Sequence, residues 1–433
     1  MKKYLGNEIN VGGIIIKIIL GFNIFTIILY LFPPIIKQHH NEVLVIIYLT
    51  SSILLIFLGF KFGRLHASNK MISPKKWFFY WSEKKMNILL FIYIITFLLK
   101  YSYNMGLSPF DINGMVSRLL IGIAEPNIGY ALARNRGISP VPWSVYFIIS
   151  VLIQFFFIIG FCAWRNLRYY QKVILIIFVL LELFFWMGTA TAFGIICIIT
   201  NILIVFLMIQ KKRNSKRNII VITFLFSIAI VFFSYNIIGR TGKGSADTAL
   251  STIEMQNSLN KEQSILKYLP ESTWSTYYYI YSYTCQGYEH LGLAMNLEPT
   301  WTYFVGNNPH LMSLSNFLTG YDPMEDSYMK KLETNYRIDS YMVWHSQYLW
   351  WANDFSIIGA LIVVFFISYF GAYSLYLYLK TGDFLSQVVS VVFLNLLLFL
   401  FANTTYLTYH FYSFMLIFPF WLFTRVIITK RIS

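Results

Sequence analysis

Three residues of one long polar segment, 239–353, have side chains suited to a transfer reaction in which a diphosphate is the leaving group. Arg240 lies near the start of the segment, and Arg337 and His345 lie near its end. A guanidinium suits a diphosphate because its planar fork makes two charge-assisted hydrogen bonds and stays charged when desolvated. Fixed cations stabilise negative charge on a leaving diphosphate, and a histidine can accept a proton from an attacking sugar hydroxyl. These residue types predict Arg240, Arg337 and His345 as a catalytic group.

An earlier polar loop, residues 101–144, supplies two further candidate cations, Arg118 and Arg134. We expect a short helix over 115–133 that is broken at Pro126 and Gly129. The arginines of this loop either meet lipid headgroups at the membrane boundary or bind an anionic substrate. The sequence leaves both alternatives open.

Two stretches of the large polar segment repeat aromatic residues near helical spacing. The first, 274–296, predicts a helix that lies along the membrane–water boundary, with a bend at Gln286 and Gly287. The second, 341–355, leads into the next apolar run. If it forms one helix with Arg337, then Arg337 and His345 lie within a quarter-turn of each other, and Asp354 lies nearly opposite His345.

The composition places this chain among membrane proteins. It is 57% hydrophobic, 19% aromatic and only 12% charged. Apolar runs long enough to cross about 30 Å of hydrocarbon must be helices, because backbone groups in lipid bond within their own segment. We therefore expect an all-α polytopic protein with about ten spans. The expected spans are 11–32, 43–60, 87–103, 145–164, 173–187, 189–209, 219–238, 357–379, 385–402 and 408–428.

The basic residues predict the orientation of these spans. The net charge is +15, and most of the lysines and arginines fall in alternate loops. Positive loops stay in the cytoplasm, so both termini are expected there, and loops 101–144 and 239–353 are expected outside. This charge distribution gives no support to a nucleic-acid partner. We treat residues 1–433 as a single integral membrane domain.

The sequence predicts neither a metal site nor a cofactor. It contains three cysteines and seven scattered histidines, without any spacing typical of metal ligands. The two halves show no internal repeat of the kind that many secondary transporters carry.

Four stretches of the polar segment and its border together indicate a family. They are GRTG at 239–242, YTCQGYEHLGLAMN at 283–296, WTYFVGNNP at 301–309, and the stretch from Trp344 to Gly359 that contains ANDFS. In order and spacing they resemble the O-antigen (Wzy-type) oligosaccharide repeat-unit polymerases of bacterial envelopes. The resemblance covers roughly residues 235–400 and extends to the first half only through topology.

This resemblance implies a reaction, a fold and a location. A growing glycan on undecaprenyl diphosphate is transferred to the terminal sugar of a new lipid-linked repeat unit, without nucleotide sugar or metal. The fold is a GT-C-like helical bundle in the bacterial inner membrane, with the large loop in the periplasm forming the catalytic part from interfacial helices. Besides the lipid-linked oligosaccharides and membrane lipid, a chain-length regulator protein and a flippase are the implied partners.

The resemblance also implies roles for individual residues. Arg240 and Arg337 match basic positions and become the expected diphosphate ligands. An arginine followed after ten residues by glycine, a spacing described for some members, occurs from Arg118 to Gly129. Gln286 and Tyr288 match a further motif and are expected to contact or position the sugar. Arg134 and Trp344 are also expected to bind substrate. The role of His345 as proton acceptor comes from its chemistry and not from the resemblance, because other family members often carry a small hydroxyl residue at this position.

Two other functions stay open at this stage. A ligase that transfers finished glycan onto another acceptor shares the fold and the diphosphate chemistry. A lipid-linked oligosaccharide flippase is also polytopic, but its outer loops are typically short, which the long segment 239–353 disfavours.

Overall fold

The structure is a computed structural model, and all the elements that it describes are helices. It describes residues 2–34, 41–69, 83–134, 143–191, 193–209, 265–270, 273–340, 345–402 and 417–425, with parts of 220–239. The α-helices are α1 (Lys2–Leu31), α2 (Glu42–Asn69), α3 (Glu83–Met105), α4 (Ile112–Ala124), α5 (Pro126–Arg134), α6 (Trp143–Ala163), α7 (Tyr169–Gly188), α8 (Phe193–Ile209), α11 (Trp274–Ala294), α12 (Pro309–Thr319), α13 (Tyr328–Tyr336), α14 (Gln347–Thr381) and α15 (Phe384–Leu398).

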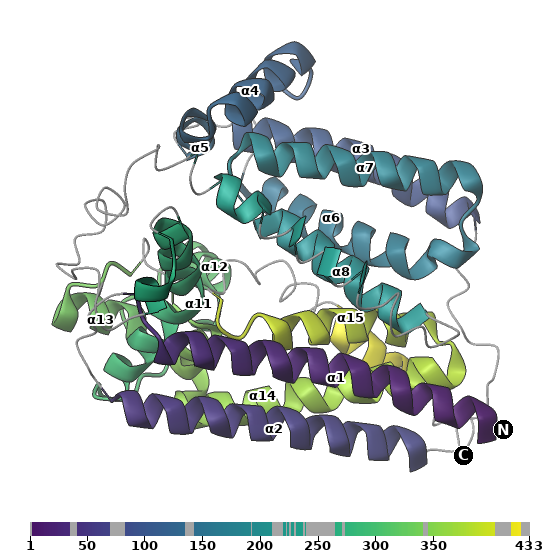
Figure 1. Cartoon of the computed structure of the whole chain (residues 1–433). Helices are drawn as coiled ribbons and strands as arrows, with labels where there is room; N and C mark the ends of the chain where they lie inside the picture. Colours follow the sequence, from purple (N-terminus) through teal and green to yellow (C-terminus); the bar gives the residue numbers. More distant parts are fainter. Residues whose placement is uncertain are drawn as a thin grey trace.

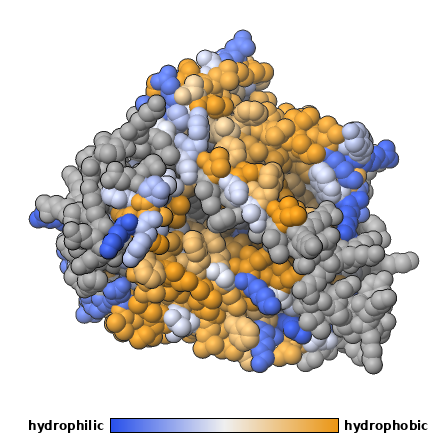
Figure 2. Space-filling view, in the orientation of Figure 1, coloured by the Kyte–Doolittle hydropathy of each residue, from blue (hydrophilic) through white to orange (hydrophobic). Residues whose placement is uncertain are grey.

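Five of the described helices are long and apolar enough to cross a membrane. They are α1, α2, α3, α7 and α14. Figure 2 shows apolar residues over most of the described surface on the face that it presents. The expected all-α membrane class is therefore confirmed. The expected spans 219–238 and 408–428 are described only in part, and the full number of spans stays a prediction.

The long helix α14 consists of two segments that meet at Ser356. This residue has φ 65° and ψ 167°, a combination that is rare for any residue other than glycine. The Ser356 hydroxyl accepts a hydrogen bond from the Gly359 N–H at 3.1 Å, so it caps the second segment. The expected span 357–379 therefore begins where a new helical segment begins.

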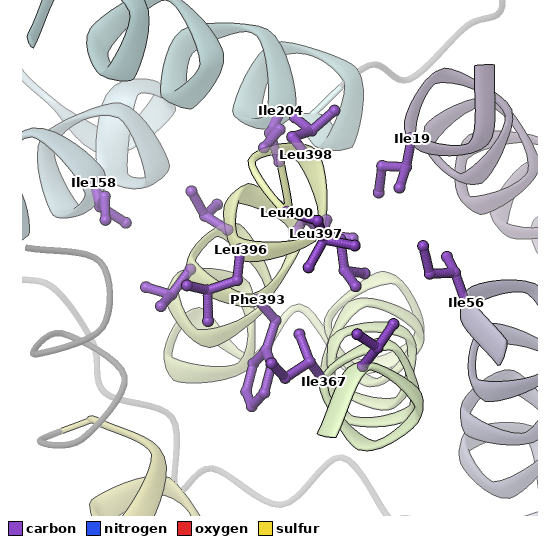
Figure 3. Packing of buried hydrophobic residues seen from close by; sticks show 14 of the residues in the cluster. Ile19, Ile56, Ile158, Ile204, Ile367, Phe393, Leu396, Leu397, Leu398 and Leu400 are labelled. Atoms are coloured by element: carbon purple, nitrogen blue, oxygen red, sulfur yellow. The ribbon is translucent and has the colours of Figure 1, made fainter. Parts of the chain in front are cut away.

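The helix α15 lies at the centre of the hydrophobic core of the bundle. Every residue of this helix from Ser386 to Leu398 is buried. Figure 3 shows Phe393, Leu396 and Leu397 pointing outward from α15 toward the surrounding helices. A mostly apolar helix in a membrane protein is covered by lipid or by other helices, and α15 is covered by other helices. The side-chain amide of its polar Asn395 donates a hydrogen bond to the side-chain oxygen of Asn201 on α8 at 2.9 Å.

Small residues bring α2 and α14 into close contact. A Cβ atom added at Gly59 would lie 2.5 Å from the Phe365 carbonyl oxygen, and one at Gly63 would lie 2.1 Å from that of Tyr369. Helices in membranes gain little from the hydrophobic effect between them, so small residues that allow close backbone packing hold them together. The Ser368 hydroxyl adds a bond to the Ile56 carbonyl at 2.6 Å.

An ion pair lies inside the apolar bundle, between α3 and α7. Lys100 Nζ lies 2.6 Å from Glu182 Oε2, and both side chains are buried. Glu182 also accepts bonds from the Tyr93 hydroxyl at 3.1 Å and the Trp186 ring N–H at 3.0 Å. The Lys100 ammonium lies 4.4 Å from the centre of the Phe185 ring. Each charge is thus matched, as a buried charge must be.

The helices of the large polar segment gather at one end of the bundle. Figure 1 shows α11, α12 and α13 beside the end where α1 finishes and α2 begins, away from the start of α1. In the smaller loop, the expected break between α4 and α5 is present at Glu125, and Pro126 opens α5. Gly129 is not a break, because it lies inside α5 and packs against Gly122.

Three expectations for the polar segment require correction. The aromatic face of α11 is buried against protein instead of lying on the membrane boundary, because α1, α2 and α14 cover it. The helix continues through Gln286 and Gly287 without ending there. Arg337 and His345 do not share one helix, since α13 ends at Tyr336 and α14 begins at Gln347.

Candidate functional site

Two of the quoted stretches meet where α11 touches the start of α14. A Cβ atom added at Gly287 would lie 2.4 Å from the backbone nitrogen of Ser346. Only glycine allows the two backbones to approach this closely. The glycine that was expected to bend the helix therefore permits a contact between α11 and α14.

This contact places two histidines against each other. The Nδ1 atoms of His290 and His345 are 3.2 Å apart, and their ring centres are 4.9 Å apart. Both rings are buried, with 1% of each side chain exposed. Burial lowers the pKa of His345 well below 6.5, and the neighbouring His290 lowers it further. His345 is therefore neutral at physiological pH.

A neutral pair joined through two Nδ1 atoms shares one proton. One ring donates its Nδ1–H and the other accepts it, so the accepting ring carries its own proton on Nε2. The His345 Nε2 atom has no hydrogen-bond partner among the residues that the structure describes. The same is true of the Ser346 hydroxyl and both amide atoms of Gln347, which are fully buried. Buried polar atoms of this kind are normally satisfied by water or a ligand. Residues 345–347 therefore form a polar centre that can take up a bound group or a proton.

The WTYFVGNNP stretch, residues 301–309, is held in place by the next turns of α14. The Asp354 carboxylate accepts hydrogen bonds from the Thr302 hydroxyl at 2.6 Å, the Phe304 N–H at 2.9 Å and the Asn307 amide at 2.9 Å. Asn353 donates to the Gly306 carbonyl at 2.7 Å. The ANDFS residues on α14 thus fix the WTYFVGNNP loop in place.

Asn353 also reaches α13. Its side-chain oxygen accepts the Tyr328 N–H at 2.9 Å, at the first residue of that helix. The first turns of α14 consequently connect the polar centre at residues 345–347 with the 301–309 loop and with α13.

Two of the expected substrate-binding residues lie on α11 with different surroundings. Tyr288 is buried, and its hydroxyl lies 3.0 Å from the hydroxyl of Thr26 on α1. The Tyr288 ring also packs edge-on against Tyr30 at 5.9 Å. This residue thus holds α11 on α1 and leaves no surface for a sugar. Gln286 is only partly buried, and its predicted contact with substrate stays a prediction.

Of the four expected arginines, only Arg118 and Arg337 have side chains that the structure describes, and these two lie on separate helices, on α4 and at the end of α13. Arg337 follows α13 in the left-handed conformation, with φ 57°, and its side chain is exposed without an ion pair to a described residue. Arg118 donates to the Met105 carbonyl at the end of α3. Arg240 and Trp344 lie outside the described residues, as does the side chain of Arg134. The spacing from Arg118 to Gly129 coincides with a packing contact, since Gly129 lies against Gly122 and the Gly188 carbonyl.

Three important residues were not identified from the sequence. His290 lies inside the quoted stretch 283–296 but carries no spacing signal toward His345. Asp354 and Asn353 were part of a quoted stretch without an assigned role. A buried polar residue next to a continuous aromatic run is a usable signal for such positions, since burying it requires a partner. The identity of that partner depends on the fold.

Among the described residues, no group of three or more His, Cys, Asp or Glu side chains is placed to hold a metal ion. Comparison with known proteins found no matching family model, curated protein or solved structure.

Proposed function

We propose that this protein joins lipid-diphosphate-linked oligosaccharide repeat units into a longer glycan at the outer face of a bacterial inner membrane. In this proposal the membrane spans number about ten, both termini are cytoplasmic and the segments 101–144 and 239–353 face the periplasm. Undecaprenyl diphosphate is the lipid carrier of both substrates.

One observation supports this proposal most strongly. Three of the four stretches that carry the resemblance to repeat-unit polymerases pack on one another, through Gly287, Asn353 and Asp354. They are 283–296, 301–309 and the described part, 345–359, of the stretch from Trp344 to Gly359. Stretches that are far apart in sequence but contact one another are typical of parts of one site. They gather at an end of a bundle whose long helices are apolar enough to span a membrane, which suits lipid-linked substrates.

The reaction breaks one bond and forms one. A hydroxyl oxygen on the terminal sugar of the new repeat unit attacks the anomeric carbon of the growing glycan. The bond from that carbon to the diphosphate oxygen breaks, and both of its electrons leave with the diphosphate. The hydroxyl proton passes to a base, and free lipid diphosphate is released. Arginine stabilises the charge that grows on the leaving group, as Arg240 and Arg337 do in this proposal.

His345 is the proposed proton acceptor because it is neutral and its Nε2 has no described partner. Its burial means that the proton reaches it through a bridging group, such as a water molecule beside Ser346. An oxocarbenium-like centre needs little help from a base. Replacing His345 should therefore slow the reaction by less than about 10²-fold and should not abolish it.

The test uses purified full-length protein in lipid vesicles with a lipid-linked repeat unit. A ladder of longer glycans, together with released lipid diphosphate, is the expected result. Transfer to a different acceptor without a ladder would indicate a ligase. Movement of the repeat unit between leaflets without bond formation would indicate a flippase.

A second arm of the same assay adds a chelator. Because arginines can neutralise the diphosphate, the ladder should persist. Loss of the ladder that magnesium or calcium restores would show that a cation shares the role given to arginine.

A further inference from the structure

Four aromatic side chains form an exposed patch beside the start of the α14 span. We call Trp301, Tyr303, Phe304 and Phe355 the aromatic ledge. The Trp301 and Phe304 ring centres are 4.7 Å apart, and those of Phe304 and Phe355 are 5.7 Å apart. Each side chain is between 40% and 66% exposed. The sequence pattern placed Phe355 in the aromatic stretch 341–355, but it predicted no membrane contact for Trp301, Tyr303 or Phe304.

The exposure of the ledge is fixed by buried hydrogen bonds. Tyr303 and Phe304 both have positive φ, at 54° and 64°, which bulky side chains rarely adopt. The buried Asp354 holds them there through the Phe304 N–H and the neighbouring Thr302 hydroxyl. Strained backbone persists only where the surrounding structure determines it, and it marks functional positions more often than ordinary loops. The fold therefore holds these rings at the surface.

The ledge continues into the exposed apolar side of a membrane-length helix. Phe355 lies against Gly359, at the start of the second segment of α14. Further along this segment, Ile358, Ile362 and Phe366 are exposed at a spacing of four residues, which places them on one side of the helix. In a bilayer this side faces lipid. Phe355 and Phe304 are thus the last members of a lipid-facing surface.

The opposite border of the ledge is polar. The Tyr303 ring packs edge-on against Tyr321 at 5.6 Å. The Tyr321 hydroxyl donates to the Asp326 carboxylate at 2.7 Å. Polarity therefore increases from the phenylalanines, through Trp301 and Tyr303, to an exposed carboxylate. Tryptophan and tyrosine favour this intermediate zone in membranes because an apolar ring carries a polar tip.

We propose that the aromatic ledge is inserted in the headgroup zone of the bilayer, so that the 301–309 loop is a membrane-contacting element. Its occupant is phospholipid, because the ledge is continuous with the apolar side of α14. A glycan is the competing occupant, since aromatic rings also stack on sugars. The planes of Trp301 and Phe304 lie at 77° to each other, so the two rings do not form one flat surface on which a sugar could stack. This geometry favours lipid as the occupant. This inference does not depend on the reaction proposed above.

The test attaches a spin label to single cysteines in the full-length protein, reconstituted in phosphatidylethanolamine and phosphatidylglycerol vesicles. Cysteine replaces Tyr303 or Trp301 in the ledge. Ile362→Cys provides the lipid reference, and Thr334→Cys on the exposed side of α13 provides the water reference. The three native cysteines are buried, and unsubstituted protein reports their background labelling. Each label is scored by its collisions with oxygen, which concentrates in lipid, and with a water-soluble nickel chelate.

Labels at positions 303 and 301 should collide more often with oxygen and less often with the nickel chelate than the label at position 334. Their collision rates should approach those of the label at position 362. Values equal to those at Thr334 would overturn the proposal. A second outcome would also overturn the proposal: the labels collide often with the nickel chelate, and added free oligosaccharide reduces these collisions. That result would indicate that the aromatic ledge binds a glycan. Tyr303 has a positive φ and Trp301 does not, so the cysteine substitution at Trp301 leaves the strained backbone unchanged. The Trp301 variant therefore still tests the proposal if Tyr303→Cys fails to fold.

Discussion

The imidazoles of His290 and His345 face each other across the contact between α11 and the start of α14, with 3.2 Å between their Nδ1 atoms. The contact exists because Gly287 lets the two backbones meet. It gives His345 a buried partner at Nδ1 and holds the orientation of its ring. His290 is therefore a positioning residue in the proposed reaction.

The first prediction concerns pH. The pKa of His345 is lowered in the folded protein, so the unfolded chain binds more protons once the pH falls below about 6.5. The stability that the neutral pair contributes is present at neutral pH and is lost as the pH falls through that value. The thermal midpoint in detergent should fall between about pH 7.5 and 5.5, and His345→Gln should flatten this dependence. The exposed His66→Gln is the control, and an equal flattening there would contradict the prediction.

The second prediction concerns Arg337, which lies in the left-handed conformation after α13. Alanine carries a Cβ, as arginine does, and would keep the backbone strain of this conformation, whereas glycine relieves it. Arg337→Gly therefore removes the guanidinium without straining the turn. Glycan synthesis should fall roughly 10- to 100-fold, as expected when about 1.5–3 kcal/mol of charged hydrogen bonding is lost. Arg337→Lys should be nearly as impaired, because lysine lacks the planar fork. Full activity of Arg337→Gly at normal abundance would remove Arg337 from the site.

The third prediction concerns Asp354. Its replacement by alanine removes three hydrogen bonds and leaves buried donors on Thr302 and Asn307. The expected loss of stability is at least about 3 kcal/mol, measured by thermal unfolding in detergent. Asp354→Asn should lose less, because it keeps the shape and one acceptor oxygen. Glu298→Ala changes an exposed carboxylate and should have little effect. Equal thermal midpoints for Asp354→Ala and Glu298→Ala would show that the hydrogen bonds of Asp354 to the 301–309 loop do not stabilise the fold.

The fourth prediction concerns the buried pair Lys100–Glu182. Lys100→Met leaves an unpaired carboxylate among apolar side chains and should cost about 3–5 kcal/mol. The double variant Lys100→Met with Glu182→Leu removes both charges and should recover much of that loss. The two unfolding curves are compared in the same detergent. A double variant that is less stable than Lys100→Met alone would show that the pair is not an isolated electrostatic unit.

The fifth prediction concerns orientation. A membrane-impermeant thiol reagent should label Thr334→Cys in intact cells, because α13 belongs to the segment expected outside. Ser68→Cys, at the end of α2, should be labelled only after the membrane is opened. Both side chains are exposed, so accessibility within the protein does not distinguish them. The reverse labelling pattern would invert the proposed topology.

The sequence by itself determined the class of the protein and several helix boundaries. Apolar runs of sufficient length predicted membrane-length helices, and the structure has them in α1, α2, α3, α7 and α14. It also predicted the break before Pro126 and the start of a span at Ile357. These properties are local, since they depend on the hydropathy of one segment and on the need of each backbone group for a nearby partner.

Only the tertiary structure decided which aromatic and polar side chains meet. Tyr288 and its aromatic neighbours on α11 are buried by α1, while Trp301 and Phe304 stay exposed because Asp354 holds their loop. An aromatic stripe has the same sequence pattern whether protein or membrane covers it. The pairs His290–His345 and Lys100–Glu182 likewise join distant segments. Such pairs form only when packing brings two helices together, and neither residue identifies its partner through spacing along the chain.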